Sequence, residues 1–335
     1  MKVLFSVGVD IAKEKFDVCI KQAKEERGSV IKGSKSFPNT EVGFKELVQW
    51  IMKRTKDTSS LIFVMEATGV YYENLAYYLH SLGFNVSVEL ANKVKHYFKS
   101  LNVKTKTDKK DASILAQMGL ERKLTLWQPM SPIYRELRDV SRLKFAFKKD
   151  LNALKNQLSA MESAHQKYEK VISLQKEQIA FYEKSIAELD RELEQVAQKD
   201  PELYQKIIKI CTIKGLKFNT VVAVICETNG FLLFENMRQL VSYSGFDVKL
   251  DESGKYKGKT RISKKGNARI REVLYMPALS AIQHNKPIAE LHKRICEKNP
   301  TAKMKGVVAG MRKLLILIYV LWKKNEVYNE NYIWI

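Results

Sequence analysis

The stretch Val3-Leu-Phe-Ser-Val-Gly-Val-Asp10 decides the fold of the N-terminal part, because an apolar, β-branched run ends there on an acid. Such a run is typical of a buried strand. Residues 61–65, Leu-Ile-Phe-Val-Met, form a second run of this kind and end on Glu66. The two acids therefore stand at the ends of two predicted core strands.

The segments around these strands complete an α/β pattern. Residues 16–21 predict a second strand, residues 29–37 a weaker third, and Pro38-Asn39 a turn. From Thr40, the spacing of apolar residues predicts a helix with one apolar face, formed by Leu47, Val48, Ile51 and Met52. With the later segments included, the order is strand, strand, strand, helix, strand, helix, strand, helix, and in this order each acid stands where a strand ends or a helix begins, as a divalent-metal nuclease site needs.

Two further acids, Asp108 and Asp111, precede the apolar positions of a predicted helix. Residues three apart on a first turn project from one face. Helix capping is the alternative role, because Thr107 or Asp108 is a plausible N-cap and acids near a helix N-terminus gain about 0.3–1 kcal/mol from the helix dipole. The order of the four acids in these contexts favours a metal site.

Carboxylates in this pattern suit Mg²⁺, with Mn²⁺ as the alternative ion. Mg²⁺ prefers oxygen ligands and is held by a few carboxylates together with substrate phosphate oxygens. Two such ions can stabilise the attacking and leaving oxygens in phosphodiester cleavage. The four cysteines contain no Cys-x-x-Cys pair. Their scatter argues against zinc and for a reducing, cytoplasmic compartment.

The charge balance indicates a nucleic-acid partner. The chain has 335 residues, 58 Lys and Arg against 37 Asp and Glu, and a formal net charge of +21. A basic protein of membrane surfaces is the competing class. The sequence has no recognisable signal peptide or lipidation motif, and its longest apolar run, residues 314–322, is too short to cross a bilayer. We therefore expect no membrane partner.

Two segments carry much of the positive charge. Residues 93–110 contain seven lysines, Lys104 and Lys106 among them, and lead into Asp108 and Asp111. Residues 254–271 contain no acid, and glycines separate their charges. A solvated surface is the alternative for both segments. The predicted nucleic-acid contacts of the second segment are Lys255, Lys257, Lys259, Arg261, Ser263, Lys264, Lys265, Asn267, Arg269 and Arg271.

The middle of the chain, residues 133–200, has neither Gly nor Pro and carries a heptad repeat of apolar and aromatic residues. This pattern predicts a coiled coil and, through it, a homo-oligomer. The repeat is interrupted at His165 and Gln175. These residues either set the register of one long helix or flank a turn that makes a hairpin, which the polar residues 162–170 permit.

The C-terminal third is predicted to be mostly helical. Residues 207–215 and 218–226 resemble two short helices, and residues 235–245 another that ends at a glycine. Residues 270–282 and 305–322 are helical by periodicity. We thus expect three domains: 1–130 with the carboxylates, 131–200 as a coiled coil, and 201–335.

Four ordered motifs resemble a known family: Gly8-Val-Asp10, Met65-Glu66-Ala-Thr-Gly69, Thr107-Asp108-Lys-Lys-Asp111, and Ser263-Lys-Lys-Gly-Asn267. They look like the DEDD transposases of the insertion-sequence family numbered one hundred and ten, the bridge-RNA-guided recombinases of prokaryotes. The resemblance covers nearly the whole chain. It implies a RuvC-like (RNase H-like) domain holding Mg²⁺, a coiled-coil linker, and a C-terminal transposase domain that supplies a serine nucleophile.

The position that matches the family's serine is Ser253, in Asp251-Glu-Ser-Gly254. From the sequence alone, Ser-Gly in a loop is ordinarily a turn. The resemblance implies that Ser253 attacks a DNA phosphodiester, while the cations that follow stabilise charge on the phosphate. It also implies donor and target DNA, a structured guide RNA and a dimer or tetramer as partners, and action at the nucleoid.

Two departures from the family's pattern lie in the C-terminal third. Lys214-Gly-Leu-Lys217 and Gly245-Phe-Asp-Val248 stand where relatives often have Pro-Gly-Ile-Gly and Gly-Leu-x-Pro. They put the local backbone and DNA contacts of this part in question, and leave the expected catalytic residues in place.

Two alternatives remain open at the level of sequence. In a metal-dependent Holliday-junction resolvase or nuclease, the carboxylates activate water and Ser253 is only a turn residue. In a non-catalytic nucleic-acid-binding scaffold built on the coiled coil, the acids have no chemical role.

Overall fold

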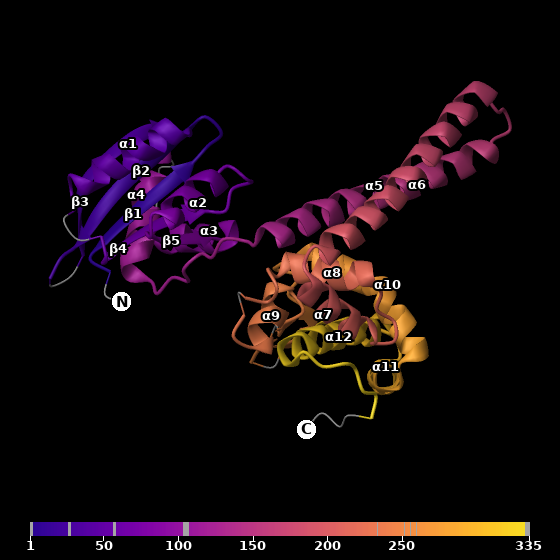
Figure 1. Ribbon diagram of the computed structural model, residues 1–335. Coiled ribbons are helices and arrows are strands. Elements are labelled where there is room, and N and C mark those ends of the chain that lie inside the picture. The colour runs from indigo at the N-terminus through magenta and orange to yellow at the C-terminus, as the bar shows by residue number, and fades with distance from the viewer. Residues whose placement is uncertain are drawn as a thin grey trace. The chain divides into compact units, whose positions relative to one another are not determined.

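The computed structural model describes residues 3–25, 28–55, 58–102, 107–232, 234–250, 252–254, 256–258 and 260–331 (Figure 1). The chain divides into two compact units, residues 1–129 and 130–335. The three expected domain boundaries stay a prediction. None of the described helices is both long enough and apolar enough to span a membrane.

The first unit is built on a five-stranded sheet with the order β3-β2-β1-β4-β5. Its strands are β1 (Phe5–Ile11), β2 (Lys15–Ala23), β3 (Ser29–Pro38), β4 (Leu61–Glu66) and β5 (Asn85–Glu89). The first three strands form an antiparallel meander, whereas β4 is parallel to β1 and β5 is parallel to β4. The predicted strands and the α/β class are confirmed.

Helices cover both faces of this sheet. They are α1 (Glu41–Met52), α2 (Glu73–Ser81), α3 (Ala91–Ser100) and α4 (Asp108–Glu121). Alternation along β4 explains the two layers, because Phe63 and Met65 join one core cluster with α1 and α2 while Ile62 and Val64 join another with α3 and α4. Both faces are buried, which is why the strand reads as a continuous apolar run.

The structure corrects one detail of α1 and supports another. Thr40 is the N-cap, and its side chain accepts a hydrogen bond from the backbone N–H of Gly43. Met52, expected on the apolar face, is 52% exposed. Phe44 takes its place in the core beside Leu47 and Ile51, because the apolar stripe begins one turn earlier than the sequence pattern indicated.

The second unit begins with an antiparallel helical hairpin formed by α5 (Pro132–Glu162) and α6 (Glu169–Gln198) (Figure 1). The hairpin was one of the two arrangements left open by the sequence. His165 lies exposed in the connection. Gln175 is buried and donates to Gln157 across the hairpin at 3.2 Å. Coiled-coil supercoiling and oligomerisation stay predictions.

A helical bundle makes up most of the rest of this unit. Its helices are α7 (Pro201–Cys211), α8 (Phe218–Glu227), α9 (Met237–Tyr243), α10 (Ala268–His284), α11 (Lys286–Lys298) and α12 (Met304–Lys324). The apolar run 314–322 lies in α12 and is largely buried, as a core helix rather than a membrane span. The buried cation Lys144 of α5 pairs with Asp190 of α6, which also accepts a hydrogen bond from Asn219 of α8.

Short strands interrupt the bundle between α9 and α10. β6 (Val248–Lys249) pairs with β9 (Arg261–Ile262), and β7 (Glu252–Ser253) pairs with β8 (Tyr256–Lys257), both antiparallel. The sequence pattern did not predict these strands, because glycines and lysines dominate the segment and β-branched residues are sparse. The segment that the sequence indicated only as a basic loop therefore contains two short antiparallel strand pairs.

Candidate active site

The acids at the strand ends lie side by side in the sheet of the first unit. Val9 of β1 is in register with Met65 of β4, so Asp10, the last residue but one of β1, and Glu66, the last residue of β4, follow on neighbouring parallel strands. Carboxyl ends of parallel strands meet at one edge of a sheet, where ligands commonly bind. The pairing of Glu66 with Glu89 brings a third acid to the same edge.

Helix α4 approaches β1 unusually closely, and this approach brings its acids to the same edge. A Cβ atom built on Gly8 would lie 2.0 Å from the carbonyl oxygen of Ala112 and 2.2 Å from the backbone nitrogen of Ala116. On the other side of the contact, a Cβ on Gly119 would lie 2.2 Å from the Ser6 hydroxyl. Glycines on both elements are therefore required for the contact.

The N-terminus of α4 is fixed by Thr107, whose hydroxyl accepts a hydrogen bond from the backbone N–H of Lys110. Thr107 is the N-cap, which leaves Asp108 and Asp111 in the first turn without a capping role. Of the two, Asp108 is exposed and Asp111 is half-buried. The capping alternative thus applies to Thr107 rather than to the aspartates.

The four predicted acids act on one another electrostatically. Burial, followed by the negative charges of Asp111, Asp108 and Glu66 in that order of size, together raise the pKa of Asp10 to about 6. This mutual repulsion identifies the edge of the sheet as a place of concentrated negative charge. A cation would relieve it, and perturbed carboxylates in such a position are candidates for function.

A side-chain cation already sits at this edge. The ammonium of Lys15 lies 3.3 Å from Asp17 and 3.4 Å from Asp108. Those two carboxylates raise the pKa of Lys15, which is solvent-exposed. Asp17 is itself buried and accepts a hydrogen bond from the Ser36 hydroxyl. Lys15 thereby holds Asp108 at the same edge as β1 and β2.

The donor set is suited to a hard divalent cation, because every predicted ligand is a carboxylate. Within the described ranges, no three His, Cys, Asp or Glu side chains are grouped closely enough to hold one ion by themselves. Mg²⁺ commonly takes only one or two carboxylates and completes its shell with water and phosphate oxygens. The residues therefore fit a metal that is shared with a phosphate substrate.

Sequence reasoning missed two acids at this edge, Glu89 and Asp17. Glu89 is buried, accepts a hydrogen bond from Ser87 at 3.1 Å and pairs with Lys93 at 2.6 Å. A weaker signal was present, since Glu89 is the last residue of a short, partly polar strand, as Glu66 is of an apolar one. Lys93, assigned to a basic segment, neutralises Glu89 in the structure.

Ser253 belongs to the second unit, in β7, where it pairs with Tyr256 of β8. It is exposed, and the following Gly254 has φ +56°, a left-handed conformation that glycine adopts without strain. The turn expected from Ser-Gly is therefore confirmed. The predicted nucleophile lies on a short hairpin that solvent can reach.

The predicted nucleic-acid-binding residues fall into three groups. Arg261, Lys264, Lys265 and Arg269 are exposed. Ser263, Asn267 and Arg271 have internal partners: the Ser263 hydroxyl donates to Asp247 at 2.6 Å, and Arg271 donates to the Ser244 carbonyl at 2.9 Å. Lys104, Lys106, Lys255 and Lys259 lie outside the described residues, and for Lys257 only the backbone is described.

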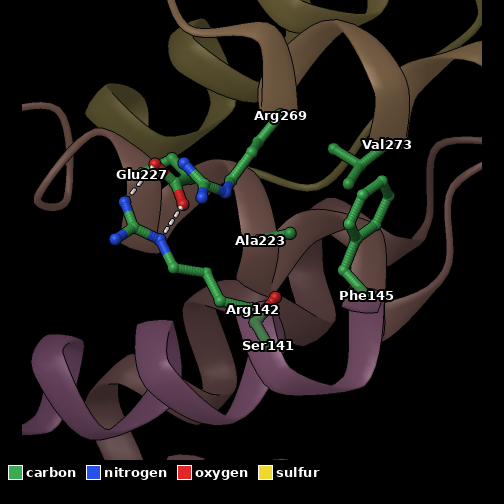
Figure 2. Close-up of a pocket in the computed structure, with 7 residues that line it drawn as sticks. All are labelled: Ser141, Arg142, Phe145, Ala223, Glu227, Arg269 and Val273. Atoms are coloured by element: carbon green, nitrogen blue, oxygen red, sulfur yellow. Dashed lines mark hydrogen bonds and ion pairs between the residues drawn. The ribbon is translucent and has the colours of Figure 1, made fainter. Parts of the chain in front are cut away.

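A pocket in the second unit was not foreseen from the sequence (Figure 2). Glu227, at the end of α8, accepts two hydrogen bonds from the Arg142 guanidinium, at 2.7 and 2.9 Å. Arg269 of α10 also lines the pocket. Burial raises the pKa of Glu227, but its hydrogen bonds from Arg142 and Asn267 outweigh this and hold it below the ordinary value.

Two family models match the chain. The model for DEDD transposases of the IS110 type, described as a transposase, matches residues 7–162. The model described as the transposase IS116/IS110/IS902 family matches residues 209–293. The first contains all four predicted carboxylates, and the second contains the basic segment and Ser253.

Two proteins named pilin gene-inverting protein are similar over nearly their whole length. Those of Moraxella bovis and Moraxella lacunata are each 29% identical over 325 residues, which is 97% of this chain and 97% of each relative. Among solved structures, Thermus thermophilus RuvC matches 37% of this chain with 9% identity and a TM-score of 0.29. RuvC with a Holliday-junction substrate matches with 10% identity and a TM-score of 0.28.

Proposed function

Because the chain belongs to the IS110 family of transposases, which are DNA-cutting enzymes, we propose that it is a site-specific recombinase of a mobile element. The curated relatives carry names that describe the inversion of a gene. By analogy, this chain cuts and rejoins DNA at defined sites. Strand exchange of this kind conserves the energy of the broken phosphodiester bond when the DNA phosphate stays covalently bonded to a side chain of the enzyme.

The observation that carries the proposal is the gathering of Asp10, Glu66, Asp108 and Asp111 at one edge of the sheet, with the pKa of Asp10 raised to about 6. In the proposed mechanism these carboxylates would hold Mg²⁺, or Mn²⁺ in its place. When bound, the ion would supply Lewis-acid stabilisation of charge on the scissile phosphate. Lys15 orients Asp108 until the substrate arrives.

In the proposed chemical step, the Ser253 hydroxyl attacks a DNA phosphorus atom. A serine–phosphate ester forms, the bond from phosphorus to one DNA oxygen breaks, and the proton lost by the serine hydroxyl passes through solvent to the departing DNA oxygen, which leaves as a hydroxyl. A second DNA hydroxyl then attacks the ester and releases Ser253. The exposure of Ser253 on its hairpin supports this role, because a duplex can reach the hydroxyl without unfolding the hairpin.

Nucleic acid is proposed to lie along the exposed cations Arg261, Lys264, Lys265 and Arg269. A structured guide RNA that pairs with donor and target DNA would leave the protein to read backbone and shape. Co-purification of RNA and its sequencing tests this step. Recovery of one structured species supports guidance, and recovery of only heterogeneous cellular RNA argues against it.

A trapping experiment tests the reaction. The protein is incubated with labelled DNA, guide RNA and Mg²⁺, then denatured, and adducts are separated by electrophoresis. The proposal predicts a covalent adduct that is absent from Ser253→Ala and from Asp10→Asn. Cleavage without any adduct would support the water-activating nuclease instead. Unchanged activity in Asp10→Asn together with undetectable metal binding would support the non-catalytic scaffold.

A further inference from the structure

The segment that carries Ser253 is a two-limbed arm, residues 243–267, which we call the serine arm. At its base, the backbone N–H of Asn267 donates to the Tyr243 carbonyl at 2.7 Å. Further along the arm, the backbone N–H of Lys264 donates to the Gly245 carbonyl at 3.1 Å, and beyond this bond β6 pairs with β9. Ser253 lies at the far end, so its position depends on how the base is held.

The base of the serine arm is attached to Glu227 from both limbs. The Asn267 amide donates to the Glu227 carboxylate at 2.8 Å, and the Tyr243 hydroxyl donates to the Glu227 carbonyl at 3.0 Å. Gly266 permits this closure, since a Cβ atom there would lie 2.1 Å from the Tyr243 carbonyl oxygen. Asn267 is also the N-cap of α10. Glu227 therefore joins both limbs of the arm.

Glu227 is in turn attached to α5, the first helix after the N-terminal unit. Arg142 of α5 contacts both carboxylate oxygens of Glu227 (Figure 2). The Glu227 side chain is 7% exposed and that of Arg142 is 36% exposed. Two-point, charge-assisted hydrogen bonds fix direction as well as distance. The buried carboxylate is thus a junction between the helical hairpin and the serine arm.

We propose that Glu227 is a positioning residue of the recombination reaction: it orients the serine arm on α5 and does not touch DNA. The inference rests on the proposed nucleophilic role of Ser253. Reactions of this kind lose about 10²-fold in rate when the reacting group is misplaced by about 1 Å. We expect a substitution at Glu227 to slow the reaction in this way, because a shift of the base of the serine arm also shifts Ser253.

Glu227→Gln tests the junction with the full chain. The amide keeps the shape of the side chain but turns an N–H₂ group towards a donor nitrogen of Arg142 or Asn267. We expect hydrogen exchange of backbone amides in residues 244–267 to become about tenfold faster, as for the loss of one charged hydrogen bond. We also expect adduct formation to slow by about 10²-fold, with unchanged DNA affinity.

Glu183→Gln is the matched control, because Glu183 pairs with Lys155 at 2.6 Å on the exposed hairpin surface, where both side chains are about half exposed. It should change neither readout. Arg142→Lys keeps the charge but not the two-point contact, and should give an intermediate loss of rate. It also serves as the test if Glu227→Gln does not fold.

Two outcomes overturn the inference: arm exchange that stays at the wild-type rate in Glu227→Gln, or faster exchange with a wild-type rate of adduct formation. A wild-type protein that forms no adduct but recombines DNA would instead overturn the serine mechanism. In that case the exchange measurement and the recombination rate of Glu227→Gln still decide whether Glu227 orients the arm.

Discussion

Substitution of Gly8 by alanine should separate α4 from the sheet and so disperse the carboxylates. The added Cβ would lie 2.0 Å from the Ala112 carbonyl oxygen, whereas ordinary contact begins at 3.4 Å. The obstructing atoms belong to the helix backbone, so no side-chain rotation relieves the clash. The helix must move back by about 1.4 Å, and we expect the free energy of unfolding of this unit to fall by about 3 kcal/mol, at the upper end for overpacking.

The same substitution should lower the pKa of Asp10, because Asp111 is the neighbouring charge that raises it most and sits at the start of the displaced helix. Carboxyl ¹³C chemical shifts followed against pH measure the pKa, and urea unfolding monitored by the fluorescence of Trp50 and Trp127 measures stability. Adduct formation should be lost in parallel.

Gly83→Ala is the control for adding a methyl group. No heavy atom lies within 4 Å of a Cβ atom built on Gly83, but its φ of +79° disfavours alanine. We therefore expect the free energy of unfolding to fall by about 1 kcal/mol and the pKa of Asp10 to stay unchanged. The reasoning is refuted if Gly8→Ala is as stable as the wild type, or if it is destabilised while the pKa of Asp10 stays at about 6.

Three further predictions concern single side chains. Asp111→Asn should lower the pKa of Asp10 in the same titration, and Lys110→Gln in the same helix turn serves as the comparison. The pKa of Glu227 in the folded protein is lower than the ordinary value of 4.5, so its pairing stabilises the fold at pH values above 4.5. This contribution is lost as the pH falls through the folded-state pKa. Arg142→Gln should accordingly cost about 2 kcal/mol at pH 7, discounted for the exposure of Arg142, and less at pH 3 by urea unfolding. Phe181→Ser should reduce the dimer fraction in light scattering without lowering the melting temperature, since Phe181 is 61% exposed on the hairpin; an unchanged mass would remove the hairpin as the oligomer interface.

The sequence predicted the first unit well because its signals are local. Apolar runs that end on Asp10 and Glu66 define strands whatever surrounds them, and Thr107 caps its helix through a neighbouring N–H. The gathering of the acids followed from topology once β4 was parallel to β1. The extra acid Glu89 carried the same signal and was passed over because its strand, Asn85–Glu89, is short and partly polar.

The second unit was harder to predict because its main contacts join residues distant in sequence. Nothing near Glu227 indicates that Arg142, Asn267 and Tyr243 meet there. The choice between one long helix and a hairpin depended likewise on tertiary pairing, since residues 162–170 permit either. Ser253 was assigned only through the family resemblance, as its local sequence indicates a turn.

The most direct test of the central claim is to locate the covalent bond between protein and DNA. Adducts formed with Mg²⁺ are digested with protease and nuclease, and the nucleotide-bearing peptide is identified by mass spectrometry. The account predicts a nucleotide on Ser253, present in the wild type and absent when Glu66 is changed to Gln. A nucleotide on another residue, or cleaved DNA that carries ¹⁸O from labelled water and no peptide, would contradict it.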